Sequence, residues 1–447
     1  MRKPIELTEE MKALKPREQS DIITQTRHYR LITPLFGGGV EPGVVDEITP
    51  VRGTAVRGHL RFWWRATRGG HFHGDLAQMK AKEDEIWGSS STESKFFLAI
   101  AYPDRASRKG KPFQDTHKRD GRSVSIGDPA SRTGYVAFSL RQTANDAVEN
   151  EVIENIAFTM TVTFVATYRQ DVEAALWAWE TFGGIGARTR RGFGALECFL
   201  VEEDGQESDP RYTITNLKEK LQSDWATHLA GGNEFPEHVP HLGAEIDKHI
   251  AITHAGGSGD GVNVWIGLIE KLQAFRHKRP QNRVTEGNRT FIRPGRNRWP
   301  EPDVIRDKVE PRKRKYPDAI YTPPIDKAPR AAFGLPIIFE LRNEGITATL
   351  KGADKNHDRF ASPLILRPLA CQNNQYAGIA LTLAGSTVND IPGGMILDGV
   401  RGNPPVSAQL TPNEAEQIAA EAKKINPNDN YNGDPDILQA FLAALKE

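Results

Sequence analysis

Five arginines stand between Pro50 and Gly70 without one acidic residue among them, shortly after a run of three glycines. The arginines are Arg52, Arg57, Arg61, Arg65 and Arg68, and the glycines are Gly37, Gly38 and Gly39. In a helix over residues 54–67, steps of four, four and three residues place the last four guanidinium groups on one face. Guanidinium groups on one face repel one another, so the row predicts that a polyanion binds against this face. Phosphate is the obvious candidate.

A second glycine-rich segment, residues 183–194 (GGIGARTRRGFG), holds five glycines and three arginines. Glycine lets backbone N–H groups approach an anion closely, and guanidinium groups grip phosphates with two donors at once. The C-terminal end of a helix needs only one glycine, so helix capping alone explains the five glycines less well than anion binding does. Arg188, Arg190 and Arg191 therefore predict a nucleic-acid contact.

The first glycine run has two interpretations, a flexible turn or a phosphate-binding loop, and the arginines after it favour the loop. It does not match GxxxxGK[ST], so nucleotide hydrolysis has no support. Leu60, Phe62, Trp63 and Trp64 share the helix with the arginines, and the three aromatic rings could stack on bases. A helix on a sheet must also bury an apolar stripe, so we expect Leu60, Trp63 and Trp64 in the core and the arginines alone in solvent.

Candidates for catalysis are few. His71 and His73 form an HxH pair without a third ligand at suitable spacing, so no metal is predicted. A histidine could serve a metal-independent ribonuclease as general acid or base, the candidates being His28, His59 and His117. A phosphate-contacting or otherwise satisfied histidine is the simpler interpretation. The residues therefore predict no catalytic centre and no cofactor.

The 447 residues exceed what one hydrophobic core usually supports, which predicts two domains. Total charge is zero, with 58 basic and 58 acidic residues, but residues 276–315 hold fourteen Lys and Arg against five Asp and Glu. This basic segment, with Phe291 and Trp299, is either a solvated loop or an arm that becomes ordered when it binds RNA.

The two cysteines, Cys198 and Cys371, provide neither a disulfide framework nor a zinc knuckle. No apolar run has the length of a membrane span, which predicts a cytoplasmic protein without membrane contact.

Hydrophobic periodicity predicts a βαββαβ order in the first half, with one strand more than that order needs. The expected strands are 27–33, 95–102, 134–140, 157–168 and 195–201, and the expected helices are 54–67 and 171–182. Residues 103–133 read as a mobile surface segment. After a link at 202–210, a similar order is expected from strands 249–254, 334–341, 346–350, 364–371 and 376–383 and helices 262–275, 411–424 and 435–445.

Three blocks of the sequence resemble a known family. Residues 32–69 (ITPLFGGGVEPGVVDEITPVRGTAVRGHLRFWWRATRG) are similar to the N-terminal signature of the first RAMP subunit of Cmr-type (type III-B) CRISPR effector complexes. The segment GGIGARTRRGFGAL resembles the glycine-rich loop typical of RAMP proteins, and GLPIIF and RFASPLILRPL resemble that family's C-terminal half. The resemblance covers nearly the whole chain, least securely at 103–133 and 276–330.

The resemblance implies an α+β protein with two ferredoxin-like (RRM-like, βαββαβ) RAMP domains and long irregular insertions. Residues 1–210 would form the first domain, and residues 211–447 the second, with the basic insertion 276–330 and the C-terminal helices.

The implied function is that of a non-catalytic subunit in antiviral defence. It would lie at the guide-RNA 3′ end, next to the related 3′-end RAMP subunit and the backbone subunit, where it holds guide RNA and admits target RNA. Its RNA-facing residues would be Gly37, Gly38, Gly39, Arg52, Arg57, Arg61, Arg65, Arg188, Arg190 and Arg191, with Arg359 and Arg367 as weaker candidates. A metal-independent endoribonuclease of the same fold, processing CRISPR RNA through His28 or His59, is the alternative.

Overall fold

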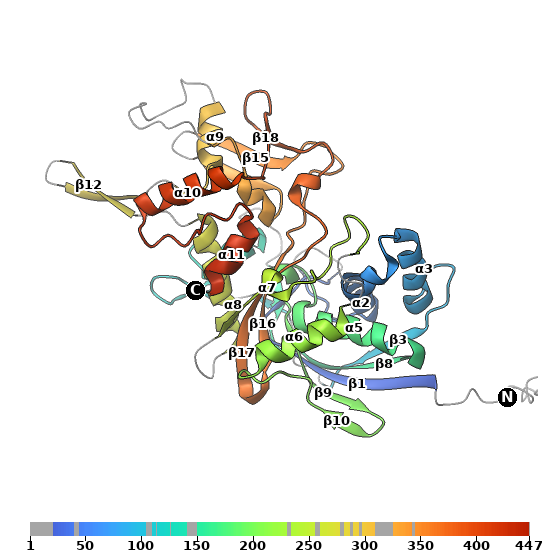
Figure 1. The fold of residues 1–447 in the computed structure, drawn as a ribbon. Coiled ribbons are helices and arrows are strands. Elements are labelled where there is room, and N and C mark those ends of the chain that lie inside the picture. The colour runs from blue at the N-terminus through green and yellow to red at the C-terminus, as the bar shows by residue number, and fades with distance from the viewer. Residues whose placement is uncertain are drawn as a thin grey trace, which may run out of the picture.

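The computed structural model has α+β architecture (Figure 1). It describes residues 21–39, 44–103, 110–112, 114–125, 127–140, 150–229, 234–254, 260–277, 281–286, 289–294, 297–308, 325–341 and 345–446. None of the helices in these ranges is long and apolar enough to cross a membrane.

A five-stranded antiparallel sheet organises the first half, in the order β10-β9-β1-β8-β3. Its strands are β1 (Ile22–Leu31), β3 (Phe96–Ala101), β8 (Ala157–Val165), β9 (Leu196–Glu203) and β10 (Gln206–Ser208). The helices between them are α2 (Gly53–Arg68) and α5 (Arg169–Phe182). The succession β1-α2-β3-β8-α5-β9 is the predicted βαββαβ order, and β10 extends one edge of the sheet.

Both helices pack on one face of this sheet because each carries an apolar stripe. In α2 the stripe is Val56, Leu60, Trp63 and Trp64, all buried, as expected for the last three. The Trp63 ring lies 5.9 Å from Phe182 of α5. In β1, alternate side chains such as Tyr29 point toward the helices, and the Tyr29 ring lies 5.7 Å from Trp179 of α5.

The second half is built on a smaller antiparallel sheet in the order β11-β17-β16. Its elements are β11 (Ile250–His254), α8 (Gly261–His277), β16 (Leu364–Cys371) and β17 (Gln375–Thr382), and α11 (Ile437–Lys446) packs on β11. Every residue of β16 is buried, because one face meets the first half and the other meets α8. Helix α6 (Leu217–His228) lies beyond the expected boundary at 210, yet its buried residues join the first core.

A further four-stranded sheet in the order β14-β15-β18-β19 has a core of its own. Its strands are β14 (Ile337–Leu341), β15 (Ile346–Gly352), β18 (Met395–Asp398) and β19 (Pro405–Val406). Thr411 caps helix α10 (Pro412–Ile425) in a capping box: the Glu414 N–H donates to Thr411 Oγ1 at 3.3 Å, and the Thr411 N–H donates to the Glu414 carboxylate at 2.7 Å. The remaining elements are β2 (Leu35–Phe36), α3 (Leu76–Trp87), β4 (Lys111–Pro112), β5 (Gln114–Thr116), β6 (Ser123–Ser125), α4 (Gly134–Ala137), β7 (Glu151–Ile153), α7 (Ile246–His249), β12 (Gln281–Glu286), β13 (Arg289–Pro294) and α9 (Glu301–Lys308).

Two sequence-based expectations are wrong, and two features of the structure were not foreseen. Residues 134–140 form helix α4 and a 3-10 turn rather than a strand. The described part of 103–133 is not free of structure, since it forms β4, β5 and β6, and its Asp115 is buried and accepts a hydrogen bond from the Thr133 N–H at 2.8 Å. The basic segment contains the β12–β13 hairpin, which projects from the body of the molecule (Figure 1), and its Trp299 is fully buried. Helix α3 was not expected at all.

Candidate functional site

The structure brings the two glycine-rich segments together. The Ala187 N–H donates to the Phe36 carbonyl at 2.8 Å, and the Gly194 N–H donates to the Pro34 carbonyl at 2.9 Å. Thr33 adds a side-chain link, because its hydroxyl donates to the Gly192 carbonyl at 2.5 Å. The two segments, about 150 residues apart in the sequence, therefore form one continuous loop surface.

Close packing of these loops accounts for several of the glycines. Gly186 has φ +80°, and a Cβ there would lie 2.6 Å from the Phe36 carbonyl oxygen. Gly37 and Gly38 have φ +76° and +106°, a region that side chains other than glycine rarely adopt. Gly38 is exposed, and a Cβ there would lie 3.9 Å from the Pro50 carbonyl, shortly before α2 begins. The glycine run therefore lies beside the start of the arginine helix.

Acidic residues of the neighbouring helix α3 pair with two arginines of the row on α2, Arg61 and Arg65. Glu83 accepts hydrogen bonds from both Arg61 Nε and Arg65 Nη1, each at 2.6 Å, and Asp84 accepts from Arg61 Nη2 at 3.2 Å. The Glu83 side chain is only 3% exposed. The expectation that the row needs an external polyanion is therefore wrong for Arg61 and Arg65, and they do not face solvent alone.

The other three arginines of the row differ from one another. Arg68 is buried, with its Nε 3.6 Å from an oxygen of Asp171 on α5. Arg57 is half-buried and donates to the Phe96 carbonyl at 3.4 Å. Arg52 is exposed at the N-cap of α2, whose first turn has no side-chain cap and no acidic residue. The positive end of the helix dipole and Arg52 thus lie together.

The arginines of the second glycine segment donate to backbone carbonyls. Arg191 donates to Leu364 at 2.8 Å and to Phe333 at 3.0 Å, and Arg190 donates to Ser362. Arg188 donates to the Val136 carbonyl at 2.8 Å, and its guanidinium lies 5.4 Å from the centre of the exposed Phe138 ring. All three side chains are half-buried. Because Ser362, Phe333 and Leu364 belong to the second half, this loop joins the two halves of the chain.

Arg276, at the end of α8, completes a cluster that we call the arginine seam: Arg188, Arg190, Arg191 and Arg276. Its guanidinium lies 5.1 Å from the Phe333 ring centre, and its buried Nε has no hydrogen-bond partner. Burial and the nearby charge of Arg276 lower the pKa of Arg191 to about 10, so Arg191 stays protonated at neutral pH. Among the described residues, no carboxylate forms an ion pair with Arg190, Arg191 or Arg276. Arg190 and Arg191 therefore keep their positive charge.

The structure contradicts the expectation that Arg367 is a weaker candidate for RNA contact. It is fully buried in β16 and donates to the carbonyls of Gly183 at 2.8 Å and Leu196 at 2.5 Å. It therefore fastens the second sheet to the end of α5 and cannot reach RNA. Arg359 is exposed, with its Nε 3.9 Å from Asp358.

The candidate histidines lie on separate elements of the structure. His28 Nε2 lies 2.5 Å from a Glu202 oxygen, and His117 Nδ1 lies 2.8 Å from an Asp120 oxygen. His59 is half-buried on α2, and burial lowers its pKa. Within the described ranges, no three His, Cys, Asp or Glu side chains gather as a metal site would require.

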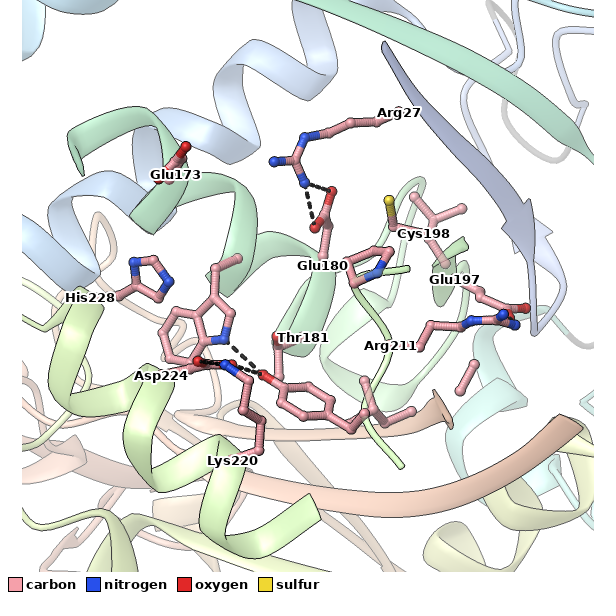
Figure 2. Close-up of a pocket in the computed structure, with 16 residues that line it drawn as sticks. Arg27, Glu173, Glu180, Thr181, Glu197, Cys198, Arg211, Lys220, Asp224 and His228 are labelled. Carbon is pink, nitrogen blue, oxygen red and sulfur yellow. Dashed lines mark hydrogen bonds and ion pairs between the residues drawn. The ribbon is translucent and has the colours of Figure 1, made fainter. Parts of the chain in front are cut away.

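A cavity of about 270 Å³, which the sequence did not indicate, lies between α5, α6 and β16 (Figure 2). Figure 2 shows the Arg27 guanidinium directed at Glu180, with both N–O distances at 3.0 Å. Lys220 likewise pairs with Asp224 on the same helix. Burial lowers the pKa of His228 to about 4, and its ring stacks on Trp177 at 4.9 Å. The charged side chains that line this cavity are paired within the chain.

The family profile and the similar proteins found for this chain are RAMP or Cmr proteins. The sequence profile of the RAMP superfamily matches residues 28–197. Two Pyrococcus furiosus proteins are similar: CRISPR system Cmr subunit Cmr1-2, 27% identical over 184 residues (38% of this chain, 93% of that protein), and Cmr1-1, 23% identical over 162 residues (35% and 43%). Crystalline Cmr1 from P. furiosus aligns with TM-score 0.46 and 18% identity, covering 81% of this chain and 88% of that chain. A chain of the type III-B Cmr-beta complex bound to cognate target RNA aligns with TM-score 0.45 and 12% identity, covering 81% and 95%.

Proposed function

Because this chain belongs to the RAMP superfamily, we propose that it is a non-catalytic, RNA-binding subunit of a type III-B CRISPR effector complex. In this proposal it acts in the cytoplasm at the guide-RNA 3′ end, beside the related 3′-end RAMP subunit and the backbone subunit. There it holds guide RNA and admits target RNA. Residues 1–210 and 211–447 would be two ferredoxin-like RAMP domains. The similarity to Cmr1-2 and Cmr1-1 supports this assignment.

The observation that carries the RNA-binding role is the uncompensated charge of Arg190 and Arg191 in the arginine seam. Guanidinium groups that donate to carbonyl oxygens are held in place without losing their charge. Several such groups side by side repel one another, and their mutual repulsion is relieved when an anion binds. A phosphate backbone is an anion of the required extent, and arginine is the residue best suited to grip it.

The glycine surface beside the seam supports the same interpretation. Gly38 is exposed, and Arg52 stands at the uncapped start of α2. A strand that crosses the seam could continue past these groups, where backbone N–H donors and the helix dipole favour phosphate. We therefore assign the main contacts to Arg188, Arg190, Arg191 and Arg52, with Arg57 and Gly37, Gly38 and Gly39 at the margin, and smaller contributions from Arg61 and Arg65.

The experiment is a salt series of RNA affinity for the full chain and for a triple variant, Arg188→Ala, Arg190→Ala and Arg191→Ala. Loss of two to three phosphate contacts should flatten the plot of log affinity against log salt by about 0.7 for each contact on a single strand. The matched variant with lysine at all three positions keeps the charges and should keep most of the slope. Thermal melts of both variants separate a loosened fold from lost contacts. An unchanged slope in a folded alanine variant would reject the proposal.

A further inference from the structure

A small cavity of about 260 Å³ lies where the arginine helix, the second glycine segment and β16 meet. Its lining includes His59, Phe62 and Trp63 from α2, and Gly184, Thr189 and Arg190 from the loop. Binding cavities commonly lie at the junction of two units, and typical ligand pockets begin at about 300 Å³. This cavity therefore suits one small planar group rather than a longer segment of chain.

The helix side of the cavity is aromatic. The Phe62 ring is only partly buried, and it meets the Trp63 ring edge-on, with centroids 5.2 Å apart and planes at 83°. Trp63 in turn is anchored on Phe182. An aromatic ring held in place by its neighbours and still accessible from a cavity is a surface on which a base can stack.

The opposite side is shaped by glycine. A Cβ at Gly183 would lie 2.8 Å from Trp63 Nε1 and 2.6 Å from the Trp179 carbonyl oxygen. A Cβ at Gly184 would lie 2.9 Å from the Gly194 carbonyl oxygen. A side chain at Gly183 would push the loop away from α2, and one at Gly184 would push apart the two ends of the glycine segment. The glycines therefore let the loop approach the aromatic wall closely enough to form a narrow cavity.

The imidazole of His59 gives the cavity a polar group. Among the described residues, none forms a hydrogen bond with its imidazole. Burial lowers the pKa of His59, so the ring is neutral near pH 7 and offers one donor and one acceptor. The edges of nucleobases carry donors and acceptors side by side, which a neutral imidazole can match.

Arg190 connects this cavity to the arginine seam. Its hydrogen bonds to described residues use Nη1 alone, which donates to Ser362. A guanidinium group has five N–H donors, so most of those of Arg190 stay available. A phosphate bound there would stand at the cavity wall, within one nucleotide of the aromatic ring.

We propose that this cavity receives a single unstacked nucleobase of the RNA strand whose phosphates lie on the arginine seam. The base stacks on Phe62 and meets His59 with its edge, while Arg190 holds the adjoining phosphate. This inference rests on the proposed RNA-binding function and adds a base-level contact to it. A pocket of this kind would fix the register of the strand on the subunit.

A double-mutant cycle between protein and RNA tests the proposal. The full chain and Phe62→Leu would be titrated with a single-stranded oligouridylate and with an abasic ribose-phosphate strand of equal length. Phe62→Leu should weaken binding of the oligouridylate at least about fivefold, the effect of one base–aromatic stack, and leave binding of the abasic strand unchanged. Phe97→Leu is the matched control, because Phe97 is an aromatic residue 55% exposed on β3, away from the cavity.

The outcomes separate the two proposals. If Phe62→Leu weakens both strands equally, or neither, while binding stays salt-dependent, the base pocket is wrong and the RNA-binding function stands. If the unaltered chain binds neither strand, the proposed function fails as well. Should Phe62→Leu fold poorly, a strand carrying 5-iodouridine would be photocrosslinked to the unaltered chain. A crosslink at Phe62 or Trp63 would support the pocket, and crosslinks confined to other regions would overturn it.

Discussion

The arginine row on α2 and the arginine seam contain the same residue type and serve different ends. In the row, Arg61 and Arg65 share the buried carboxylate of Glu83. In the seam, Arg190 and Arg191 donate to backbone carbonyls of the second half. Both arrangements engage guanidinium donors in hydrogen bonds. Only the first cancels charge.

This difference decides which region can attract a polyanion. An ion pair leaves little net field beyond its own dimensions, whereas unpaired guanidinium groups act over a Debye length, about 8–10 Å in physiological salt. A carbonyl oxygen holds the guanidinium in position and leaves its full charge. An arginine-rich segment is therefore informative about RNA binding only when the acceptors of its donors are known.

The largest expected effect concerns the paired region. Glu83→Gln removes the carboxylate charge and leaves the Arg61 and Arg65 guanidinium groups against a neutral amide. We expect the free energy of unfolding to fall by about 2 kcal/mol, less than for a fully buried pair because both arginines are partly exposed. Urea denaturation with a constant m-value measures the change.

The control for that change is Glu85→Gln on the same helix. The Glu85 side chain is 44% exposed, pairs with Lys82 at 3.1 Å and accepts a hydrogen bond from the Tyr168 hydroxyl, which a glutamine oxygen can also accept. Exposed pairs contribute about 0–1 kcal/mol, so this variant should lose less than 1 kcal/mol. Equal losses for Glu83→Gln and Glu85→Gln would show that the buried carboxylate does not hold the row.

The second-largest expected difference between the two regions is the effect of an arginine substitution on RNA affinity. Arg190→Ala removes one phosphate donor and should weaken RNA binding about tenfold, as expected for one charge-assisted contact. Arg65→Ala removes an arginine that Glu83 already neutralises and should change affinity less than about twofold. Fluorescence anisotropy with one RNA at one salt concentration compares them. A larger loss for Arg65→Ala than for Arg190→Ala would reverse the comparison.

A smaller effect on stability is expected from substituting two glycines, one inside α2 and one in the first glycine run. Gly58 lies inside α2, and a Cβ there would meet nothing within 4 Å. Gly58→Ala should therefore stabilise the helix by about 0.5–1 kcal/mol. Gly38 has φ +106°, so Gly38→Ala should destabilise by about 1 kcal/mol. Thermal melts that move in the same direction for both variants would contradict this contrast.

The smallest expected effect is that of pH. Burial lowers the pKa of Arg191, but only to about 10, so both it and Arg190 stay protonated throughout the neutral range. RNA affinity should therefore stay constant within about twofold between pH 6 and 8. A bell-shaped RNA cleavage rate over the same range, lost in His28→Ala or His59→Ala, would instead favour the ribonuclease alternative.

Much of the fold could be predicted from periodicity, and the main omission has a physical cause. Helix α3 (LAQMKAKEDEIW) buries Met79, Glu83, Ile86 and Trp87, a set with a carboxylate in the middle of its apolar face. Such a face has no clean apolar stripe, so hydrophobic spacing did not reveal it. Asp75, which accepts from the Gln78 N–H as N-cap, was the available signal. Without α3, the row of arginines lacked its counter-charges.

Two other differences arise from tertiary contacts. The segment 134–140 (GYVAFSL) is a short apolar run, which periodicity cannot assign to a strand or a helix, and in the structure it packs with Trp265 and Ile269 of α8. Arg367 interrupts the apolar strand β16, and its burial follows from the Gly183 and Leu196 carbonyls on the first half. No local pattern could indicate acceptors that lie about 170 residues away in the sequence.

The most direct test of the central claim is to locate RNA on the full chain by ultraviolet crosslinking and mass spectrometry of the linked peptides. If the uncompensated arginines bind RNA, crosslinks will concentrate in residues 183–194 and around the start of α2. The outer face of α2 and α3, which carries Arg61, Arg65 and Lys80, will give few. Crosslinks on that face, with none in residues 183–194, would contradict the account.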